Sequence, residues 1–245
     1  MPKLPIECVD GRKKYILFKN DCGVSDVARG GGLYESYIFD WLKDHNTNLT
    51  GTTVVDVGAN LGNHSLEFAD MVGEGGQVVA FEAQRLTYYQ LCGNIILNGY
   101  PNIFAHNIAI GNQRGWTLVE TPNFLSPNTI NVGNVHVDTI PPTHLSRQTS
   151  CLIKMSTLDD FFSVSRNGVS VLKIDVEGFE PYVLDGAKEL IKQNQPIIFI
   201  EIWDVNLRVY DFKEQDVFDR LDAMGYKWEK LIKADHIIDY VAVPK

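Results

Sequence analysis

Three acidic residues stand where apolar runs of this chain end. Asp56 follows TVV, Glu82 follows QVVAF, and Asp175 follows VLKI. A carboxyl group at the end of a buried strand costs free energy unless it is hydrogen-bonded or used. Because the carboxyl ends of parallel strands line the ligand crevice of an α/β sheet, these three residues predict a binding site at that edge.

The glycine-rich bend after the first run reads DVGANLGNHS. Gly58 permits a tight turn, and Gly62 lets the backbone approach a ligand at a helix N-terminus. Glu82 is placed to accept hydrogen bonds from ribose hydroxyls. A dinucleotide fold needs a third glycine, which this bend lacks, and Asp56 would repel a phosphate but suit an ammonium group. The bend therefore favours S-adenosylmethionine, which has no phosphate; the alternative is that its glycines only shape the turn.

A second cluster of charges lies around LKIDVEGFE and FIEIW. Lys173 and Asp175 point to the same face of their strand, and Glu177 lies in the turn that follows. Glu201 lies within an apolar run, where an unpaired acid is costly. Asp175, Glu177 and Glu201 could deprotonate a substrate hydroxyl, hold sugar hydroxyls or bind a hard cation. The alternatives are a helix cap, which we expect for Glu180, and pairing with Lys173.

Histidines and one tryptophan add further candidates. His64, at the start of the helix after the bend, is a second candidate for the base, with packing or capping as its alternative role. We expect His106, within a strand, to be structural. His136 and His144 lie in a polar stretch from which they could reach an acceptor, although loop histidines are usually solvated. Trp203 could stack on a sugar or merely cover the core.

Strand and helix patterns alternate regularly around these residues. Near-continuous runs of Val, Ile and Phe indicate parallel strands that are buried on both faces. YKWEKLI and IIDYVAV, with no helix between them, predict an antiparallel pair that closes one sheet edge. We therefore predict an α/β fold with a seven-stranded, mostly parallel sheet and helices on both faces. Its other strands are expected at 53–58, 77–82, 102–110, 169–177 and 196–203, and its helices at 33–43, 62–72, 85–98, 181–192 and 214–224.

Two segments fall outside this alternation. We expect residues 1–50 to form an extended lead-in, with a strand at 15–18, followed by a helix. Residues 111–156 are rich in Asn, Thr, Pro and Ser, and we interpret them as a hairpin and a mobile loop inserted over the active-site rim. Because this insertion is too short and too polar to fold alone, we predict a single domain over 1–245.

The motifs VVDVGANLGNHS, FEA, NIAIG, TLDDF and LKIDVEGFEPYVLDGA occur in this order, and PIIFIE follows them. Together they span most of residues 34–202 and resemble the FkbM-type methyltransferases. This resemblance implies a class I, Rossmann-like fold and an S-adenosylmethionine-dependent enzyme, usually an O-methyltransferase that acts on sugars or secondary metabolites. The family usually has FEP where this chain has FEA, a change that mainly affects the turn.

The resemblance also implies roles for individual residues. Glu82 would bind the ribose, Asn107 and Ala109 would border the adenine, and Tyr34 and Glu35 would close over the cofactor. The cofactor-binding residues expected on this basis are Tyr34, Glu35, Asp56, Gly58, Asn60, Gly62, Asn63, Glu82, Asn107, Ala109 and Asp175. The catalytic candidates are Asp175, which is our first choice of base, Glu177, His64 and Glu201.

Composition limits the partners. The chain has 31 acidic residues against 22 Lys and Arg, for a net charge of −9, which disfavours nucleic acid and anionic membranes. Its four cysteines form no CxxC pair, which disfavours a disulfide framework and suits a reducing compartment. No apolar run approaches the roughly 20 residues of a membrane span. We expect a cytoplasmic protein with a small-molecule or glycan acceptor, no nucleic acid and no membrane insertion.

Rival functions are left open by the sequence. RNA ribose 2′-O-methyltransferases use a Lys-Asp-Lys-Glu set; this chain has Lys173, Asp175 and Glu201, but no lysine ends the strand of Glu201. A nicotinamide oxidoreductase would need the third glycine, and a binding protein without catalysis would not need the acids. We predict no metal site, although a metal-assisted reaction stays open.

Overall fold

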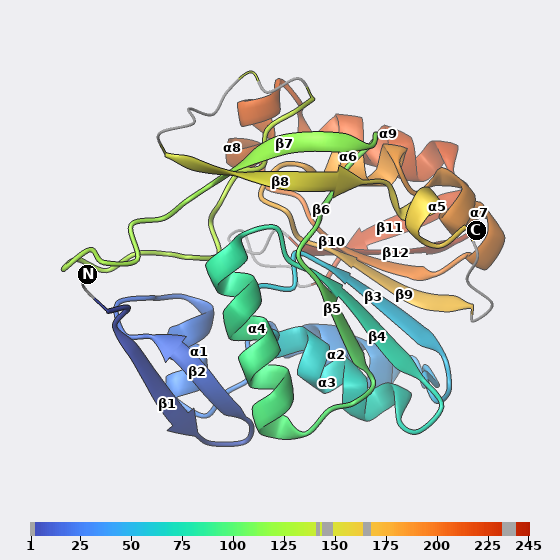
Figure 1. Cartoon of the computed structure of the whole chain (residues 1–245). Helices are drawn as coiled ribbons and strands as arrows, with labels where there is room; N and C mark the ends of the chain where they lie inside the picture. The colour runs from blue at the N-terminus through green and yellow to red at the C-terminus, as the bar shows by residue number, and fades with distance from the viewer. Residues whose placement is uncertain (1–2, 141–142, 144–148, 164–167, 232–238) are drawn as a thin grey trace.

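The computed structural model describes residues 3–140, 143, 149–163, 168–231 and 239–245. Its centre is a seven-stranded sheet in the order β11-β12-β10-β9-β3-β4-β5 (Figure 1). β12 runs antiparallel to both of its neighbours, and the remaining pairs are parallel. The predicted sheet with its antiparallel closing pair is confirmed. The strands are Thr53–Val57 (β3), Gln77–Phe81 (β4), Ile103–His106 (β5), Val169–Ile174 (β9), Ile197–Glu201 (β10), Tyr226–Lys230 (β11) and Asp239–Pro244 (β12).

Helices cover both faces of this sheet (Figure 1). Val54 and Val78 belong to the core on one face, whereas their chain neighbours Val55 and Val79 belong to the core on the other. Alternate strand residues thus build two cores, as the two-residue period of a strand requires. The first core is covered by α2 (Tyr37–Asp44), α3 (Asn63–Val72) and α4 (Arg85–Asn98). The second is covered by α5 (Leu158–Phe161), α6 (Glu180–Asp185), α7 (Lys188–Asn194) and α9 (Glu214–Ala223).

Two predicted elements are divided in the structure. The expected strand 102–110 ends at His106, and the chain resumes as β6 (Ala109–Ile110) in a separate sheet. Asn107 stabilises this break, because its side-chain amide donates to the carbonyl groups of the two residues after β4. The expected helix 181–192 is split at Gly186, where an added Cβ would lie 2.0 Å from the carbonyl oxygen of Gly111. A close backbone contact that only glycine allows therefore separates α6 from α7.

The helix expected at 33–43 begins later, at Tyr37. Tyr34 and Glu35 lie in the turn before it, and Glu35 has a φ of 50°. This left-handed conformation is uncommon for a residue other than glycine. The Glu35 side chain is therefore directed by a turn and not by the helix.

The lead-in forms a small unit beside α4 (Figure 1). The expected strand 15–18 is part of β2 (Lys14–Phe18), which pairs with β1 (Ile6–Asp10) as an antiparallel ribbon, and α1 (Val24–Arg29) follows. Neither β1 nor α1 is expected from the sequence, because segments of five and six residues show no clear period.

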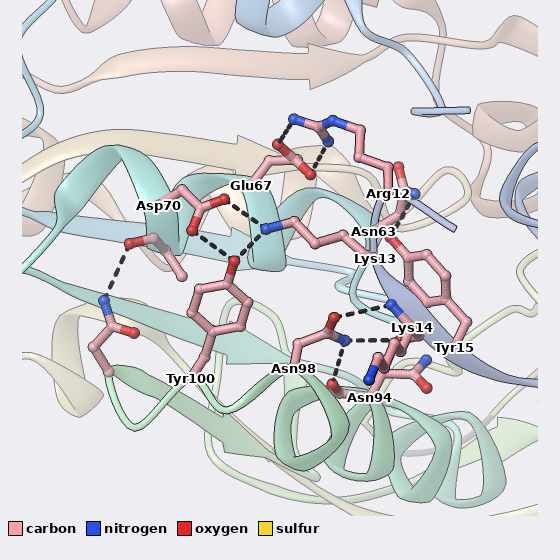
Figure 2. Close-up of polar contacts among 12 residues, drawn as sticks. Arg12, Lys13, Lys14, Tyr15, Asn63, Glu67, Asp70, Asn94, Asn98 and Tyr100 are labelled. Atoms are coloured by element: carbon pink, nitrogen blue, oxygen red, sulfur yellow. Dashed lines mark hydrogen bonds and ion pairs between the residues drawn. The ribbon is translucent and has the colours of Figure 1, made fainter. Parts of the chain in front are cut away.

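Ion pairs attach the turn of this ribbon to α3 (Figure 2). Arg12 forms a bidentate ion pair with Glu67. Lys13 Nζ lies 2.5 Å from Asp70 Oδ2, and it also contacts the hydroxyl of Tyr100, which donates to Asp70 Oδ1 at 2.6 Å. Each cation of the turn thus meets a carboxylate of α3.

The insertion builds a second small sheet. β7 (Gly115–Glu120) and β8 (Ser150–Ser156) form the expected antiparallel hairpin, and β6 runs parallel to β8. Side chains of this sheet pack on Phe179 and Tyr210, just before α6 and within the 3-10 helix η1 (Arg208–Tyr210). The mobile loop expected in this insertion falls partly on 141–142 and 144–148, which lie outside the described residues.

Candidate active site

A pocket opens at the carboxyl ends of β3, β4, β9 and β10, where α/β sheets bind ligands. The space between its walls that protein atoms do not fill is about 850 Å³, open mouth included. The predicted site residues that line it are Tyr34, Glu35, Gly58, Asn60, Glu82, Ala109, Asp175, Glu177 and Glu201. Those outside its lining are Asp56, Gly62, Asn63, His64 and Asn107.

The glycine-rich bend brings β3 against β9. Gly58 has a φ of 84°, and an added Cβ would lie 1.7 Å from the carbonyl oxygen of Asp175, so no other residue fits there. Gly62 also has a left-handed φ, but it faces Leu91 of α4 and not the pocket. The first glycine therefore sets the distance between the two acidic strand ends, and the second seats α3 on α4.

Asp56 lies deeper than the sequence suggests. It is completely buried, and its Oδ2 accepts a hydrogen bond of 2.5 Å from Ser65 Oγ. Burial raises the pKa of Asp56, and the nearby Lys173 and the Ser65 hydroxyl oppose that rise. The residue that pairs with it in β9 is Lys173. Asp56 thus belongs to the floor beneath the pocket and not to its surface.

Glu82 joins the bend to the end of β4. Its Oε2 accepts from the backbone N–H of Asn60 at 2.9 Å, and its Oε1 accepts from that of Gln84 at 2.7 Å. Burial raises the pKa of Glu82 to about 7, against the lowering effect of these two N–H groups. The carboxyl group is fixed at the pocket wall, with lone pairs left for hydroxyl donors.

Lys173 is the buried cation of this region. It is 2% exposed, and its Nζ lies 2.8 Å from Asp175 Oδ2. Burial by itself would lower the pKa of Lys173, but Asp175, Asp56 and Glu35 outweigh it and raise that pKa. Asp175 lines the pocket. Asp175 therefore forms the ion pair with Lys173 that was one of the alternatives from the sequence. Lys173 does not contact its other oxygen, Oδ1.

Glu35 closes the pocket on the side of α2. Its side chain is 10% exposed, and its Oε2 has no hydrogen-bond partner within the part of the chain that the structure describes. Burial raises the pKa of Glu35 to about 9, and the acids Asp239 and Asp175 add to the rise against the opposing Lys173. Near neutral pH this carboxyl group is protonated, and it can donate one hydrogen bond into the pocket.

His64 supports this turn from behind. Its Nε2 lies 3.0 Å from the carbonyl oxygen of Tyr34 and 3.4 Å from Glu35 Oε2. Since a carbonyl group only accepts, the ring carries its proton on Nε2. Burial and the charge of Lys173 lower the pKa of His64 well below its usual range. The neutral ring is buried beside Phe39, its donor is engaged, and it does not line the pocket, which suits the packing alternative and not the role of base.

Glu177 and Glu201 complete the acidic wall. Burial and neighbouring acids raise the pKa of both groups, for Glu177 to about 8. Glu180 does not line the pocket; it begins α6, as expected, and accepts from two backbone N–H groups of the preceding turn. Among the described residues, the pocket lining holds five acidic side chains and no Lys, Arg or His.

The outer wall is made by the lead-in and the insertion, which bond to one another. Cys22 donates its N–H to the carbonyl oxygen of Ile130 at 3.0 Å, and Val132 donates to Asp21 Oδ1 at 3.0 Å. Neighbours of these residues, Gly23 and Val24 on one side and Asn131, Gly133, Val135 and Val137 on the other, line the pocket. These residues are not expected from the sequence, because no local pattern indicates a contact between residues more than 100 positions apart.

The remaining candidates have structural contacts. Asn63 does not reach the pocket; its Oδ1 accepts from the N–H of Tyr34 at 3.1 Å, and its Nδ2 donates to the hydroxyl of Tyr15 at 3.2 Å. His106 stacks on Phe81, at 5.5 Å between ring centroids.

Two aromatic candidates lie outside the pocket lining, and a third falls outside the described residues. His136 Nδ1 lies 3.4 Å from Glu120 Oε2, and Trp203 is 39% exposed just beyond β10. Neither side chain lines the pocket. His144 lies outside the described residues.

The described residues show neither a metal-binding cluster nor a membrane-spanning helix. No group of three or more His, Cys, Asp or Glu side chains in that part of the chain is arranged to hold a metal ion. None of its helices is long and apolar enough to cross a membrane.

Comparison with known proteins places this architecture in a family. The model of the methyltransferase FkbM domain matches residues 56–228. A solved FkbM methyltransferase from Methylobacillus flagellatus shares 17% identity at a TM-score of 0.50, over 78% of this chain and 43% of its own. This chain thus spans less than half of that protein.

Fibrillarin from Aeropyrum pernix, solved with natively bound S-adenosyl-L-methionine, shares 12% identity at a TM-score of 0.50, over 94% of this chain and 89% of its own. At such identities the likeness shows a common fold, that of the class I methyltransferases. No curated protein matches this chain.

Proposed function

This chain belongs to the FkbM methyltransferase family, and from that premise we propose an S-adenosylmethionine-dependent O-methyltransferase that acts on a hydroxyl group of a small molecule or glycan. Our preferred acceptor is a sugar. The observation that carries the proposal is the position of Asp175, which lines the pocket at the end of β9 and is held there by the buried Lys173.

The residues of the pocket fit this cofactor. Glu82 offers a fixed carboxyl group to the two ribose hydroxyls, and Ile108 and Ala109 offer an apolar surface to the adenine. Within the described part of the chain, Asn60 Oδ1 and Glu35 Oε2 are buried oxygens without a hydrogen-bond partner, and both residues line the pocket. We assign them to the amino acid part, in place of Asp56, which is buried beneath the lining. When bound, S-adenosylmethionine supplies a methyl group that is already activated by its sulfonium.

The acidic wall supports a hydroxylated acceptor. Carboxyl groups accept hydrogen bonds from alcohols and orient them, and alignment alone can contribute about 7–11 kcal/mol to a two-substrate reaction. Removal of the hydroxyl proton by a positioned base adds about 10²–10⁴-fold. Phosphorylated acceptors, including the RNA backbone, would meet acids and no described basic side chain in the lining. We therefore prefer a neutral sugar to RNA.

The cofactor is tested by isothermal titration with S-adenosylhomocysteine. We expect micromolar binding to the wild type and a loss of at least tenfold in Glu82→Ala. Glu74→Ala, which removes an exposed glutamate after α3, is the matched control and should bind like the wild type. Absence of binding to the wild type, or stabilisation by NAD in its place, would exclude the proposed cofactor.

The acceptor is tested by transfer of a labelled methyl group to a panel of neutral sugars, phenols, peptides and RNA. Label in a sugar hydroxyl, lost in Asp175→Asn, would support the proposal. Label in RNA alone would replace the proposed acceptor class with the ribose 2′-hydroxyl.

A further inference from the structure

Glu177 has an unusual backbone for a residue of its kind. Its φ is 55°, in the left-handed region, and Gly178 after it has a φ of 97°. An added Cβ at Gly178 would lie 2.3 Å from the carbonyl oxygen of Asn206, in α8 (Asp204–Leu207). The turn that follows β9 is thus pressed against α8. Strained conformations persist only where their surroundings fix them, and they gather at functional sites.

Hydrogen bonds from two sides hold this turn in place. Glu180 Oε1 accepts from the N–H groups of Val176 and Gly178, both at 3.1 Å. Asn206 Nδ2 donates to Glu177 Oε2, and Asn206 is 4% exposed. Its own N–H donates to the carbonyl oxygen of Trp203 at 3.0 Å in the turn of α8. Within the described chain, no other side chain donates to the Glu177 carboxyl group, which therefore keeps its second oxygen for the pocket that it lines.

The two candidate bases differ in what holds them. Asp175 accepts from the ammonium group of Lys173, whereas Glu177 accepts from the neutral amide of Asn206. The charged groups that face Glu177 are Lys173 on β9, Asp175 just after β9, Glu180 on α6 and Glu201 on β10. Burial and the neighbouring acids Asp175 and Glu180 raise the pKa of Glu177, which favours its uptake of a proton.

We propose that Glu177 is the proton acceptor of the methyl transfer and that Asn206 is its positioning residue. This inference rests on the function proposed above, and Asn206 is not among the residues that the sequence singles out. The proton of the acceptor hydroxyl passes to the Glu177 carboxylate while the oxygen forms its bond to the methyl carbon. The methyl–sulfur bond breaks, and its electron pair stays on sulfur. Asp175, held by Lys173, orients the same hydroxyl.

The positioning role is tested without an acceptor, by carbon-13 NMR of protein labelled at the glutamate side-chain carboxyl carbons. The resonance that Glu177→Gln removes should titrate with a midpoint of about 8. Asn206→Ala should raise that midpoint by about one pH unit, because it removes a hydrogen bond to the charged form. Asn206→Asp, which keeps the shape of the side chain, serves if the alanine variant does not fold. It should also raise the midpoint.

Asn194→Ala is the matched control. Asn194 also uses its amide to hold a turn, since it accepts from the N–H of Val169 and donates to the carbonyl oxygen of Leu190, but at the opposite end of β9. It should leave the Glu177 midpoint unchanged. A Glu177 resonance that titrates in the ordinary range near 4.5, or that ignores Asn206, would overturn the proposal.

The catalytic role is tested with the acceptor that the methyl-transfer panel identifies. Glu177→Gln should lower kcat by about 10²–10⁴-fold while KM for the acceptor changes little. In Asn206→Ala the acid limb of the kcat–pH profile should move upward together with the NMR midpoint, which a merely structural role would not cause. Retained activity in Glu177→Gln alongside inactivity of Asp175→Asn would assign the proton to Asp175 and refute the inference.

Binding of S-adenosylhomocysteine separates this inference from the proposed function. Both Glu177→Gln and Asn206→Ala should bind it like the wild type. If the wild type itself does not bind it, the proposed function fails, whereas the NMR result still decides whether Asn206 controls the Glu177 carboxyl group.

Discussion

Two charged regions differ in how their charges are balanced. One is the ribbon anchor, formed by Arg12 and Lys13 with Glu67 and Asp70, and the other is the pocket floor around Lys173. At the anchor, Arg12 and Lys13 each meet a carboxylate of α3 close to solvent, so that positive and negative groups are matched. In the pocket floor, several buried carboxyl groups surround the buried cation Lys173, and burial together with neighbouring acids raises the pKa of Glu35 and that of Glu177 against the effect of Lys173. The ribbon anchor holds β1 and β2 against α3. In the pocket floor, carboxyl groups with raised pKa values are placed to exchange protons with a bound ligand.

The largest effect is expected from substitution of Lys173 in the pocket floor. Lys173→Met would leave Asp175 and Asp56 without their cation, and removal of one partner of a buried pair typically costs about 3–5 kcal/mol. We expect a loss of that size in the free energy of unfolding, measured by urea denaturation. Lys188→Met is the control, because Lys188 pairs with Asp185 at 2.9 Å near the surface. Equal losses of unfolding free energy in Lys173→Met and Lys188→Met would contradict the difference between the buried ion pair and the surface ion pair.

The second prediction concerns the pH dependence of stability. Glu35 has a pKa of about 9 in the folded protein and an ordinary value near 4.5 when unfolded, so the folded state binds the extra proton between these values. Its contribution to stability is full below the unfolded pKa and is lost as pH rises toward 9, by up to about 1.4 kcal/mol per pH unit. Glu35→Gln should flatten this decline in thermal melts between pH 5 and 9. A decline of unchanged slope would show that Glu35 is ionised in the fold.

Asn63 connects the two regions, because it bonds the hydroxyl of Tyr15 in the ribbon and the N–H of Tyr34 above the pocket. Asn63→Ala leaves both groups without this partner, and we expect a loss of about 1–3 kcal/mol in unfolding free energy together with weaker binding of S-adenosylhomocysteine. Asn98→Ala, which removes bonds between α4 and the exposed end of β2, should lower stability without changing that affinity. An unchanged affinity in Asn63→Ala would mean that the turn holding Tyr34 is set by other contacts.

The smallest effect is expected at the ribbon anchor. The Lys13 side chain is 12% exposed, but its partner Asp70 is 52% exposed, so solvent screens the pair. Lys13→Met should cost about 0–1 kcal/mol, and less at high salt. The measurement is urea denaturation at low and high sodium chloride. A salt-independent loss as large as that of Lys173→Met would contradict the contrast between the two regions.

Much of the fold could be predicted because the relevant signals are local. The alternation of apolar runs places β3, β4, β9 and β10 within a few residues, and the tail pair closes the sheet as expected. The exceptions, at Asn107 and Gly186, come from contacts with segments distant in sequence, a side-chain amide bonding the end of β4 and a backbone meeting Gly111. No periodicity in the sequence reports such contacts.

The sequence by itself determined the strand ends, the glycine at position 58 and the acids Glu82, Asp175 and Glu177, since the order of strands sends these residues to one edge of the sheet. Only the tertiary structure decided which of the acids face the pocket. It buries Asp56 beneath the lining, engages His64 with the carbonyl group of Tyr34, and brings Asn206 onto Glu177. The physical reason is that the proton affinity and the direction of a side chain depend on partners tens of residues away, which come within reach only when the chain packs.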